Sequence, residues 1–245
     1  MRLPILVLAV FLSVAPASAQ VKGYRDVVTA AAVSDEGLFT VHRVNNRLLF
    51  EIPEAMLGRD MIVMSRIAKT QDGLGDGGAT MAPNIVVRWE RRDHRIVLRA
   101  VSHARTAEAG TPLELAVENA NFAPVLASLP VQAAGEKTWV VDVTDLYMGD
   151  TPAFTLPRNR RTQLGVRSLD RERGWIEWAR SFPINVEVRV VQTYAADQPP
   201  TNARGGAVSF EVNHSMILLP ETPMMPRYAD ERVTYISSTQ TNYSS

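Results

Sequence analysis

Apolar and polar residues alternate along several stretches of this chain, which is the pattern of β-strands with one buried face. In residues 207–219 the even-numbered positions are apolar apart from His214, and the positions between them are mostly polar. Residues 84–101 alternate on both sides of a predicted turn at residues 92–94. Shorter stretches with strand character are 138–143, 175–179 and 186–194. The pattern predicts strands joined as antiparallel hairpins.

The clearest hairpin signal lies near the start, in the stretch LFTVHRVNNRLLFEI. Asn45 and Asn46 can take the left-handed conformation that a tight turn needs, so residues 38–44 and 47–52 are expected to pair antiparallel. The mostly apolar residues 61–67 fit a central strand with both faces covered.

Short helices are predicted between the strands. Pro53 suits the start of one helical turn, and Gly58 can end it with a positive φ. Residues 113–117 are a second candidate, and Thr144 is expected to cap a third short helix that Gly149 closes. The conformations of residues 124–129 and 151–174 stay open. The predicted fold class is mainly β, a β-rich α+β arrangement of antiparallel hairpins and sheets with a few short helices.

The first residues are typical of a secretory signal peptide. Arg2 precedes an apolar stretch at residues 3–14, and Ala17-Ser18-Ala19 forms a small-residue cleavage site. The alternative is a membrane anchor, but that stretch is shorter than the ~20 residues of a spanning helix. The chain has no cysteine, which excludes a lipid anchor on cysteine and disulfides. We expect a periplasmic or extracellular protein with no stable membrane anchor.

A glycine-rich stretch, QDGLGDGGA at residues 71–79, marks the sharpest shift in composition. It lacks the lysine and the following helix of a phosphate-binding loop, so we interpret it as a connector. The predicted organisation is a signal peptide at 1–19, a small N-terminal β domain at 20–70, a Gly-rich linker at 71–82, and a second β-rich domain at 83–245 that is cut short at its C-terminal end.

Charge gives no reason to expect nucleic acid as a partner. The chain holds 26 basic and 26 acidic residues, so its net charge is zero. The arginines of residues 84–101 are interrupted by Glu90 and Asp93, which favours the solvated face of a strand pair over a nucleic-acid patch.

No catalytic or metal site is predicted within this chain. The histidines His42, His94, His103 and His214 have no partner at i, i+4, so the HExxH zinc motif is absent. A zinc site built from His94 or His103 with carboxylates is a weaker alternative. No serine lies in a G-x-S-x-G elbow, and the sequence does not identify a Ser–His–Asp set. His214, alone on an apolar face, is expected to be a core residue.

Several stretches together resemble the N-terminal part of a bacterial family of large secreted zinc-dependent metallopeptidases. In that family two uncharacterised domains precede a metzincin-like catalytic domain. The stretches are YRDVVTAAAVSDEGLFTVHR (24–43), LLFEIPEAMLGRDMIVMSRIAK (48–69), VVRWERRDHRIVLR (86–99), AVENANFAPVLASLPV (116–131), VVDVTDLYMGD (140–150), SFPINVEV (181–188) and SMILLPETPMMPRYADERVTYIS (215–237). They run in order through nearly the whole mature chain, and the catalytic signature HExxHxxGxxH is not among them.

The resemblance implies the non-catalytic N-terminal portion of an exported zinc-dependent metallopeptidase. Its partner would be the metzincin-like catalytic domain of the same polypeptide, where the zinc is expected, and its role would be that of a scaffold, pro-domain or interdomain element. The alternative is a stand-alone exported β-rich binding module without enzymatic activity.

The irregular C-terminal stretch at residues 219–235 is the predicted contact with a neighbouring domain, because in the family it leads towards the catalytic portion. We expect its apolar side chains to pack on that domain and its charged ones to form ion pairs that set the orientation. These residues are Met224, Met225, Tyr228, Arg227, Asp230 and Arg232. The alternative is an ordinary exposed tail. The chain departs from the family where Val233-Thr234-Tyr235 replaces an expected glycine before the aromatic residue.

Overall fold

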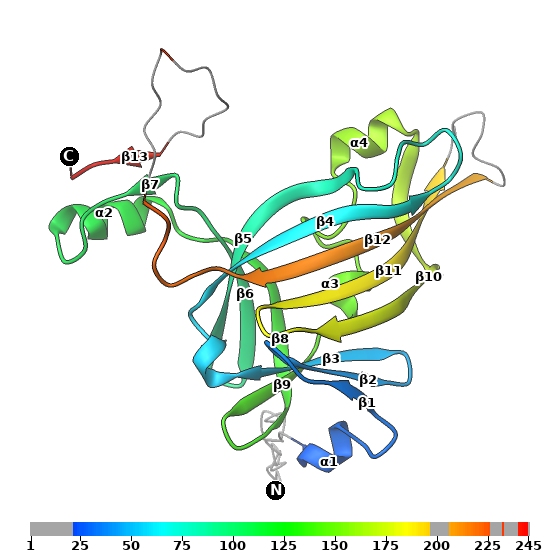
Figure 1. Cartoon of the computed structure of the whole chain (residues 1–245), viewed down its shortest axis with the longest axis horizontal. Helices are drawn as coiled ribbons and strands as arrows, with labels where there is room; N and C mark the ends of the chain where they lie inside the picture. Colours follow the sequence, from blue (N-terminus) through cyan, green and yellow to red (C-terminus); the bar gives the residue numbers. More distant parts are fainter. Residues whose placement is uncertain (1–21, 197–205, 226–231, 233–239, 245) are drawn as a thin grey trace, which may run out of the picture.

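The computed structural model describes residues 22–196, 206–225, 232 and 240–244. Its centre is an antiparallel sheet with the strand order β1-β2-β3-β9-β8-β6-β5-β4-β12-β11-β10 (Figure 1). These strands are β1 (Val33–Asp35), β2 (Thr40–Val44), β3 (Arg47–Pro53), β4 (Asp60–Thr70), β5 (Thr80–Arg92), β6 (Arg95–Val101), β8 (Val125–Ala134), β9 (Thr138–Asp142), β10 (Val166–Ser181), β11 (Asn185–Ala196) and β12 (Ala207–Leu218).

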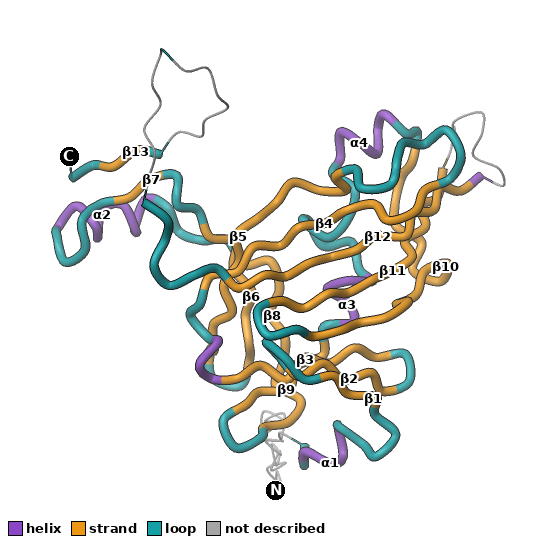
Figure 2. Tube along the Cα trace, viewed as in Figure 1, coloured by secondary structure: helices purple, strands orange, loops and turns teal. Residues whose placement is uncertain are grey.

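The remaining elements are short and lie between or beside the strands (Figure 2). They are α1 (Tyr24–Val27), the 3-10 turn η1 (Glu54–Met56), β7 (Arg105–Thr106), α2 (Pro112–Ala120), α3 (Thr144–Met148), α4 (Arg158–Gln163) and β13 (Thr241–Asn242). The mainly β class with a few short helices, predicted from the alternation of apolar and polar residues, is therefore confirmed.

Turn residues explain several of the connections. Asn45 has a φ of 55° between β2 and β3, and Asp93 has a φ of 53° between β5 and β6. Gly58 has a φ of 80° at the end of the helical turn. Side chains other than glycine, asparagine and aspartate rarely adopt these angles, so the sequence marks these turns directly.

The helix predicted after Thr144 is present and Gly149 closes it as expected, but Thr144 is not its N-cap. The N-cap position is Val143, and the Thr144 hydroxyl instead accepts from the Leu48 backbone N–H (2.9 Å) and donates to Asp142 (2.6 Å). Gly149 closes the helix with a φ of −91° and not a left-handed angle. Glycine is nevertheless required there, because a Cβ would lie 2.4 Å from the Asp145 carbonyl oxygen.

The sheet curls until its two edges meet. The Leu38 backbone N–H donates to the Phe182 carbonyl (2.7 Å), and the Ser181 N–H donates to the Asp35 carboxylate (2.9 Å). The Arg43 guanidinium donates to two carbonyl groups of β10, those of residues 176 and 177, at 3.1 and 3.0 Å. We call this contact between β1–β2 and β10 the seam.

Aromatic and aliphatic side chains fill the space inside the curl. The largest fully buried side chains are Trp89, Tyr147, Tyr194, Phe39, Phe50, Phe154 and Phe210. Helix α3 contributes the Tyr147 ring, which packs edge-on against Phe154 with ring centres 5.1 Å apart. The sheet is therefore wrapped around α3 and the segment 150–157 that follows it.

Three polar side chains on the inner face bind that segment, and a fourth, His214, bonds one of them. Gln192 donates to the Phe154 carbonyl (2.9 Å), while the Tyr194 hydroxyl donates to Gln192 (2.9 Å) and accepts from the Leu156 N–H (3.0 Å). Ser65 donates to the carbonyl of Ala153 (2.9 Å), and its hydroxyl also lies 2.8 Å from His214 Nδ1.

His214 occupies the core position expected of it, with 1% of its surface exposed. Because Ser65 uses its proton on the Ala153 carbonyl, His214 Nδ1 is the nitrogen that donates to Ser65. Nε2 then carries a lone pair that has no partner among the described residues. Burial lowers the pKa of His214 to about 3, so the ring is neutral in the folded protein.

The division into two folding units, predicted at the glycine-rich stretch, stays a prediction. The strands on either side of that stretch, β4 and β5, are neighbours in the sheet, and Leu74 within it is buried. The signal peptide at 1–19 lies outside the described residues. In the part of the chain that the structure describes, every helix is too short or too polar to cross a membrane.

Gly37 should be essential to the seam. A Cβ there would lie 2.5 Å from Ser181 Oγ and 2.7 Å from the Phe182 backbone. We expect Gly37→Ala to lower the free energy of unfolding by about 1–3 kcal/mol, measured by urea unfolding followed by tryptophan fluorescence. The control Gly77→Ala, whose nearest contact would be the Ala68 carbonyl at 3.3 Å, should change it by less than ~0.5 kcal/mol. Equal stability of the two variants would contradict the role of the seam.

His214 should make stability depend on pH between about 3 and 6.5. Its folded pKa of about 3 lies below the ordinary value of 6.5, so in this range the unfolded chain binds a proton that the folded chain does not. Stability therefore falls with falling pH, by up to ~1.4 kcal/mol per pH unit from this group. His214→Gln should remove that part of the slope in urea unfolding measured from pH 4.5 to 6.5. Parallel slopes for the two proteins would show that His214 ionises as readily in the folded state.

Candidate interaction surface

A small arm projects from the end of the sheet, away from the curled body (Figure 1). The arm consists of residues 102–124, which include β7 and α2, together with β13 from the C-terminal segment. β13 pairs with β7 in parallel, and the N–H groups of Thr241 and Tyr243 donate to the carbonyls of Ala104 and Thr106 at 2.8 and 3.0 Å. Two distant parts of the chain therefore build the arm.

The start of α2 is determined by its local sequence. The Thr111 hydroxyl accepts from the Glu114 N–H at 3.3 Å, and Pro112 occupies the first helical position. The Glu114 carboxylate reaches back to accept from the Gly110 N–H at 2.6 Å. These reciprocal bonds resemble a capping box and explain why a helix forms where little tertiary packing supports it.

Helix α2 buries none of its residues. Leu113 is 48% exposed and Leu115 is 59% exposed, while Phe122, just after the helix, is 76% exposed. Leu113 also borders a cavity of about 260 Å³ that Ala116, Val117, Ala120 and the half-exposed ring of Tyr243 line. Several large apolar side chains exposed on one small element are typical of a surface that binds another protein.

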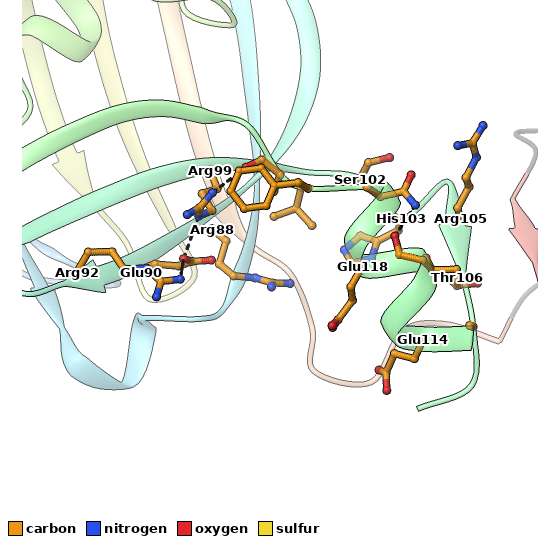
Figure 3. A pocket seen from close by; sticks show the side chains of 16 residues that line it. Arg88, Glu90, Arg92, Arg99, Ser102, His103, Arg105, Thr106, Glu114 and Glu118 are labelled. Carbon is orange, nitrogen blue, oxygen red and sulfur yellow. Dashed lines mark hydrogen bonds and ion pairs between the residues drawn. The ribbon is translucent and has the colours of Figure 1, made fainter. Parts of the chain in front are cut away.

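Beside the arm lies a cleft of about 480 Å³ between α2 and the strands β5 and β6 (Figure 3). Arginines dominate its wall on the sheet. Arg99 forms an ion pair with Glu90 (3.0 Å), donates to the Ala123 carbonyl (2.8 Å) and lies 4.9 Å from the centre of the Phe122 ring. Arg92 shares the same glutamate at 2.9 Å.

A second ionic group lies next to this one. Asp60 accepts from Arg88 and from His103, each at 2.7 Å. Burial by itself would raise the pKa of Asp60, but the hydrogen bonds from Arg88 and His103 outweigh it and hold the pKa below the ordinary value. The pKa of Glu90 is lowered in the same way, against burial, by Arg92 and Arg99. Both carboxylates are therefore ionised at neutral pH.

The cleft is suited to recognition by charge and shape. It combines fixed guanidinium groups with an aromatic ring and with the exposed carboxylate of Glu118 on α2 (Figure 3). A partner carrying both apolar and charged side chains would complement this surface and the neighbouring helix.

The C-terminal residues predicted to contact another domain are described only in part. Met224 and Met225 are 76% and 82% exposed, and Arg232 is also exposed. Arg227, Tyr228 and Asp230 lie outside the described residues. The predicted contact stays a prediction, and so does the alternative of an exposed tail.

The segment that carries the two methionines is attached to the start of β4. The Leu219 N–H donates to the Asp60 carbonyl (2.9 Å), and Arg59 pairs with Glu221 (2.7 Å). From there the chain runs towards the arm (Figure 1). The segment that ends with the two methionines therefore leads towards the arm, which the sequence did not indicate (Figure 1).

The two histidines considered for zinc have different surroundings. His103 pairs with Asp60, and His94 lies exposed in the turn between β5 and β6. Within the described residues, no three histidine, aspartate or glutamate side chains form a group that could hold a metal.

Sequence reasoning identified a helix near residues 113–117 but missed the exposed arm. A signal was present, because Leu113, Ala116, Val117 and Ala120 follow the spacing of an apolar helical stripe. What faces that stripe is Tyr243 of the C-terminal segment, and no local pattern connects residues so far apart.

Removing the charge of Glu90 tests whether its ion pairs with Arg92 and Arg99 stabilise the sheet side of the cleft. Glu90→Gln leaves Arg92 and Arg99 without their carboxylate, so we expect the free energy of unfolding to fall by about 1–3 kcal/mol in urea unfolding. Glu118→Gln, on the exposed side of α2, is the matched control and should change it by less than ~0.5 kcal/mol. Unchanged stability of both variants would mean that the ion pairs of Glu90 do not stabilise the protein.

Comparison with protein families gives two matches that together span nearly all of the described chain. A family described as a domain of unknown function (DUF5117) matches residues 78–245, and a second, described as a domain of unknown function (DUF5118), matches residues 21–70. One match ends just before the glycine-rich stretch and the other begins at residue 78 within it, and neither description states an activity. No curated protein and no solved structure matches the chain.

Proposed function

The chain belongs to the family of domains of unknown function DUF5117, preceded by a DUF5118 region. From this premise we propose that it is the N-terminal module of an exported zinc-dependent metallopeptidase and is non-catalytic in proteolysis. Its role is to hold or position a metzincin-like catalytic domain of the same polypeptide. Proteolysis and zinc belong to that domain, and no step of the chemistry is assigned to this chain.

The proposal rests on one observation, the exposed arm. Helix α2 is too short to be stable through its own hydrogen bonds, yet it presents two leucines to solvent. Contact with another domain would bury these side chains and stabilise the helix. The resemblance supplies the partner, because the metallopeptidases that this chain resembles carry a catalytic domain after two such domains.

The C-terminal segment supports the same role. In the resembling proteins this part of the chain leads towards the catalytic portion, and here it brings Met224 and Met225 to the surface and then adds β13 to the arm. Methionine adapts to irregular apolar surfaces, which suits a contact between domains. The arm and these methionines would face the same partner.

Export through the signal peptide at 1–19 is part of the proposal. The mature chain would begin near Gln20, in the periplasm or outside the cell, and no membrane lipid or nucleic acid is needed as a partner. N-terminal sequencing of the protein recovered from those compartments checks this location.

The cleft favours a second candidate, a stand-alone exported binding module. Its volume of about 480 Å³ and its mixed charges would suit a peptide segment without any catalytic domain. The two candidates differ in the partner that they bind.

A binding experiment decides between them. The chain is mixed with a separately expressed metzincin-like catalytic domain that naturally follows DUF5118 and DUF5117 regions, and association is measured by calorimetry. We expect a complex that Leu115→Ser weakens about 10-fold or more, because a buried leucine contributes about 1.5–3 kcal/mol. The matched control is Trp175→Ser on β10, which removes a half-exposed side chain at the far edge of the sheet and should leave binding unchanged.

Absence of association in the unmodified protein would overturn the first candidate. Binding of unstructured peptides that is lost in Glu90→Gln would then favour the second. Equal loss of catalytic-domain binding in the Leu115 and Trp175 variants would show that the arm is not the contact.

A further inference from the structure

The outer face of the first three strands brings a serine, a histidine and a glutamate into one hydrogen-bonded row. Ser34 on β1 is paired with His42 on β2, so the two side chains lie on the same face. Glu51 on β3 is paired with Thr40, two residues from His42, and therefore shares that face. Ser34 Oγ lies 2.7 Å from His42 Nδ1, and His42 Nε2 lies 3.0 Å from Glu51 Oε2.

A small second core buries the histidine and leaves the serine accessible. Val44, Leu49 and Val140 belong to this core, which the N-terminal segment with α1 covers. His42 is only 3% exposed, whereas Ser34 is exposed on the edge strand of the sheet. The imidazole is thus held in a dry environment directly beneath a hydroxyl that solvent can reach.

The hydrogen bonds determine which nitrogen carries the proton. Glu51 accepts from His42, from Thr138 (2.5 Å) and from Tyr24 (2.6 Å), and these bonds lower its pKa to about 2 although burial opposes them. Burial and the neighbouring Glu51 raise the pKa of Tyr24 to about 12, so the phenol keeps its proton and donates. An ionised Glu51 can only accept, so His42 carries its proton on Nε2. When the imidazole carries only that proton, Nδ1 accepts from the Ser34 hydroxyl.

These three groups have the relation of nucleophile, base and orienting carboxylate. We propose that Ser34 is an activated nucleophile that takes acyl groups from small carboxylic esters with good leaving groups. The exposed position on an edge strand favours small, unhindered esters. This activity is independent of the proposed interdomain role and uses no metal.

The proposed ester hydrolysis needs water as its only co-reactant. The Ser34 oxygen bonds to the carbonyl carbon of the ester while its proton passes to His42 Nδ1, and Glu51 stabilises the imidazolium. The bond to the leaving oxygen breaks, and the imidazolium returns the proton to that oxygen. Water, deprotonated by the same nitrogen, then releases the carboxylic acid and restores the hydroxyl.

Covalent labelling of the full chain tests the nucleophile. A fluorophosphonate reagent should attach to the Ser34 oxygen with loss of fluoride, and mass spectrometry of the digested protein locates the adduct. Ser34→Ala should abolish labelling, and Glu51→Gln should slow it about 100-fold or more, because general base catalysis contributes about 10²–10⁴-fold. Ser168→Ala, which removes an exposed serine on β10, should label at the unmodified rate.

A second measurement leaves His42 and Glu51 unchanged. The chain has no cysteine, so Ser34→Cys and Ser168→Cys each introduce a single thiol. Next to an imidazole base a thiol ionises more readily, so at pH 7 iodoacetamide should alkylate the Ser34→Cys protein about 10-fold faster than the Ser168→Cys protein. Circular dichroism confirms that both variants are folded.

Folded protein whose Ser34 takes no label, with equal alkylation rates for the two thiols, would overturn the proposal. The row would then only support the bond by which Glu51 holds Tyr24 of α1. Label that appears on Ser34 and on exposed serines alike would overturn it as well, because activation requires selectivity.

Discussion

The arrangement of the whole molecule depends on how the inside of the curled sheet is filled. The segment 150–157 lies there without strand partners, so its backbone groups need hydrogen bonds that no neighbouring strand supplies. Ser65, Gln192 and Tyr194 provide them from β4 and β11. An unsatisfied buried group would cost about 1–3 kcal/mol, so these side chains allow a segment outside the regular strands to serve as core.

Filling the inside determines how far the sheet can curl, and the curl determines where its edges meet. At the seam, Arg43 bonds carbonyl groups of β10 that would otherwise lie on an open edge. The first strands and the last long strands are thereby joined, and β4 lies between β5 and β12. Residues matched by the two families thus contribute neighbouring strands to one sheet.

The local parts of this fold were predictable, and the distant ones were not. The alternation in β12 and the turn residues Asn45 and Asp93 identified strands and hairpins, because side-chain period and backbone conformation are encoded within a few residues. Nothing local encodes the pairing of His214 with Ser65 across 149 positions. The same limit applies to the arm. The sequence indicates the apolar stripe of α2, but it does not indicate that Tyr243 of the C-terminal segment lies beside it.

The Ser34–His42–Glu51 row shows a different reason for failure. All three residues lie within one short stretch, and the hairpin that places His42 near Glu51 was predicted. Strand β1 was not, because its three residues are all exposed and show no alternation. Without that strand the serine had no assigned face, and the histidine remained a single residue on a hairpin.

Both proposed functional regions lie where the chain leaves the regular sheet. In the curled sheet, the seam supplies hydrogen-bond partners to the edges and the filled interior buries the apolar side chains. The sheet therefore does not depend on a partner for these contacts. The arm instead keeps apolar side chains open to solvent, and β1 keeps the hydroxyl of Ser34 open to solvent. The contacts that hold the curled sheet together are separate from the exposed side chains of the arm. The sheet can therefore position a second domain through the arm without deforming.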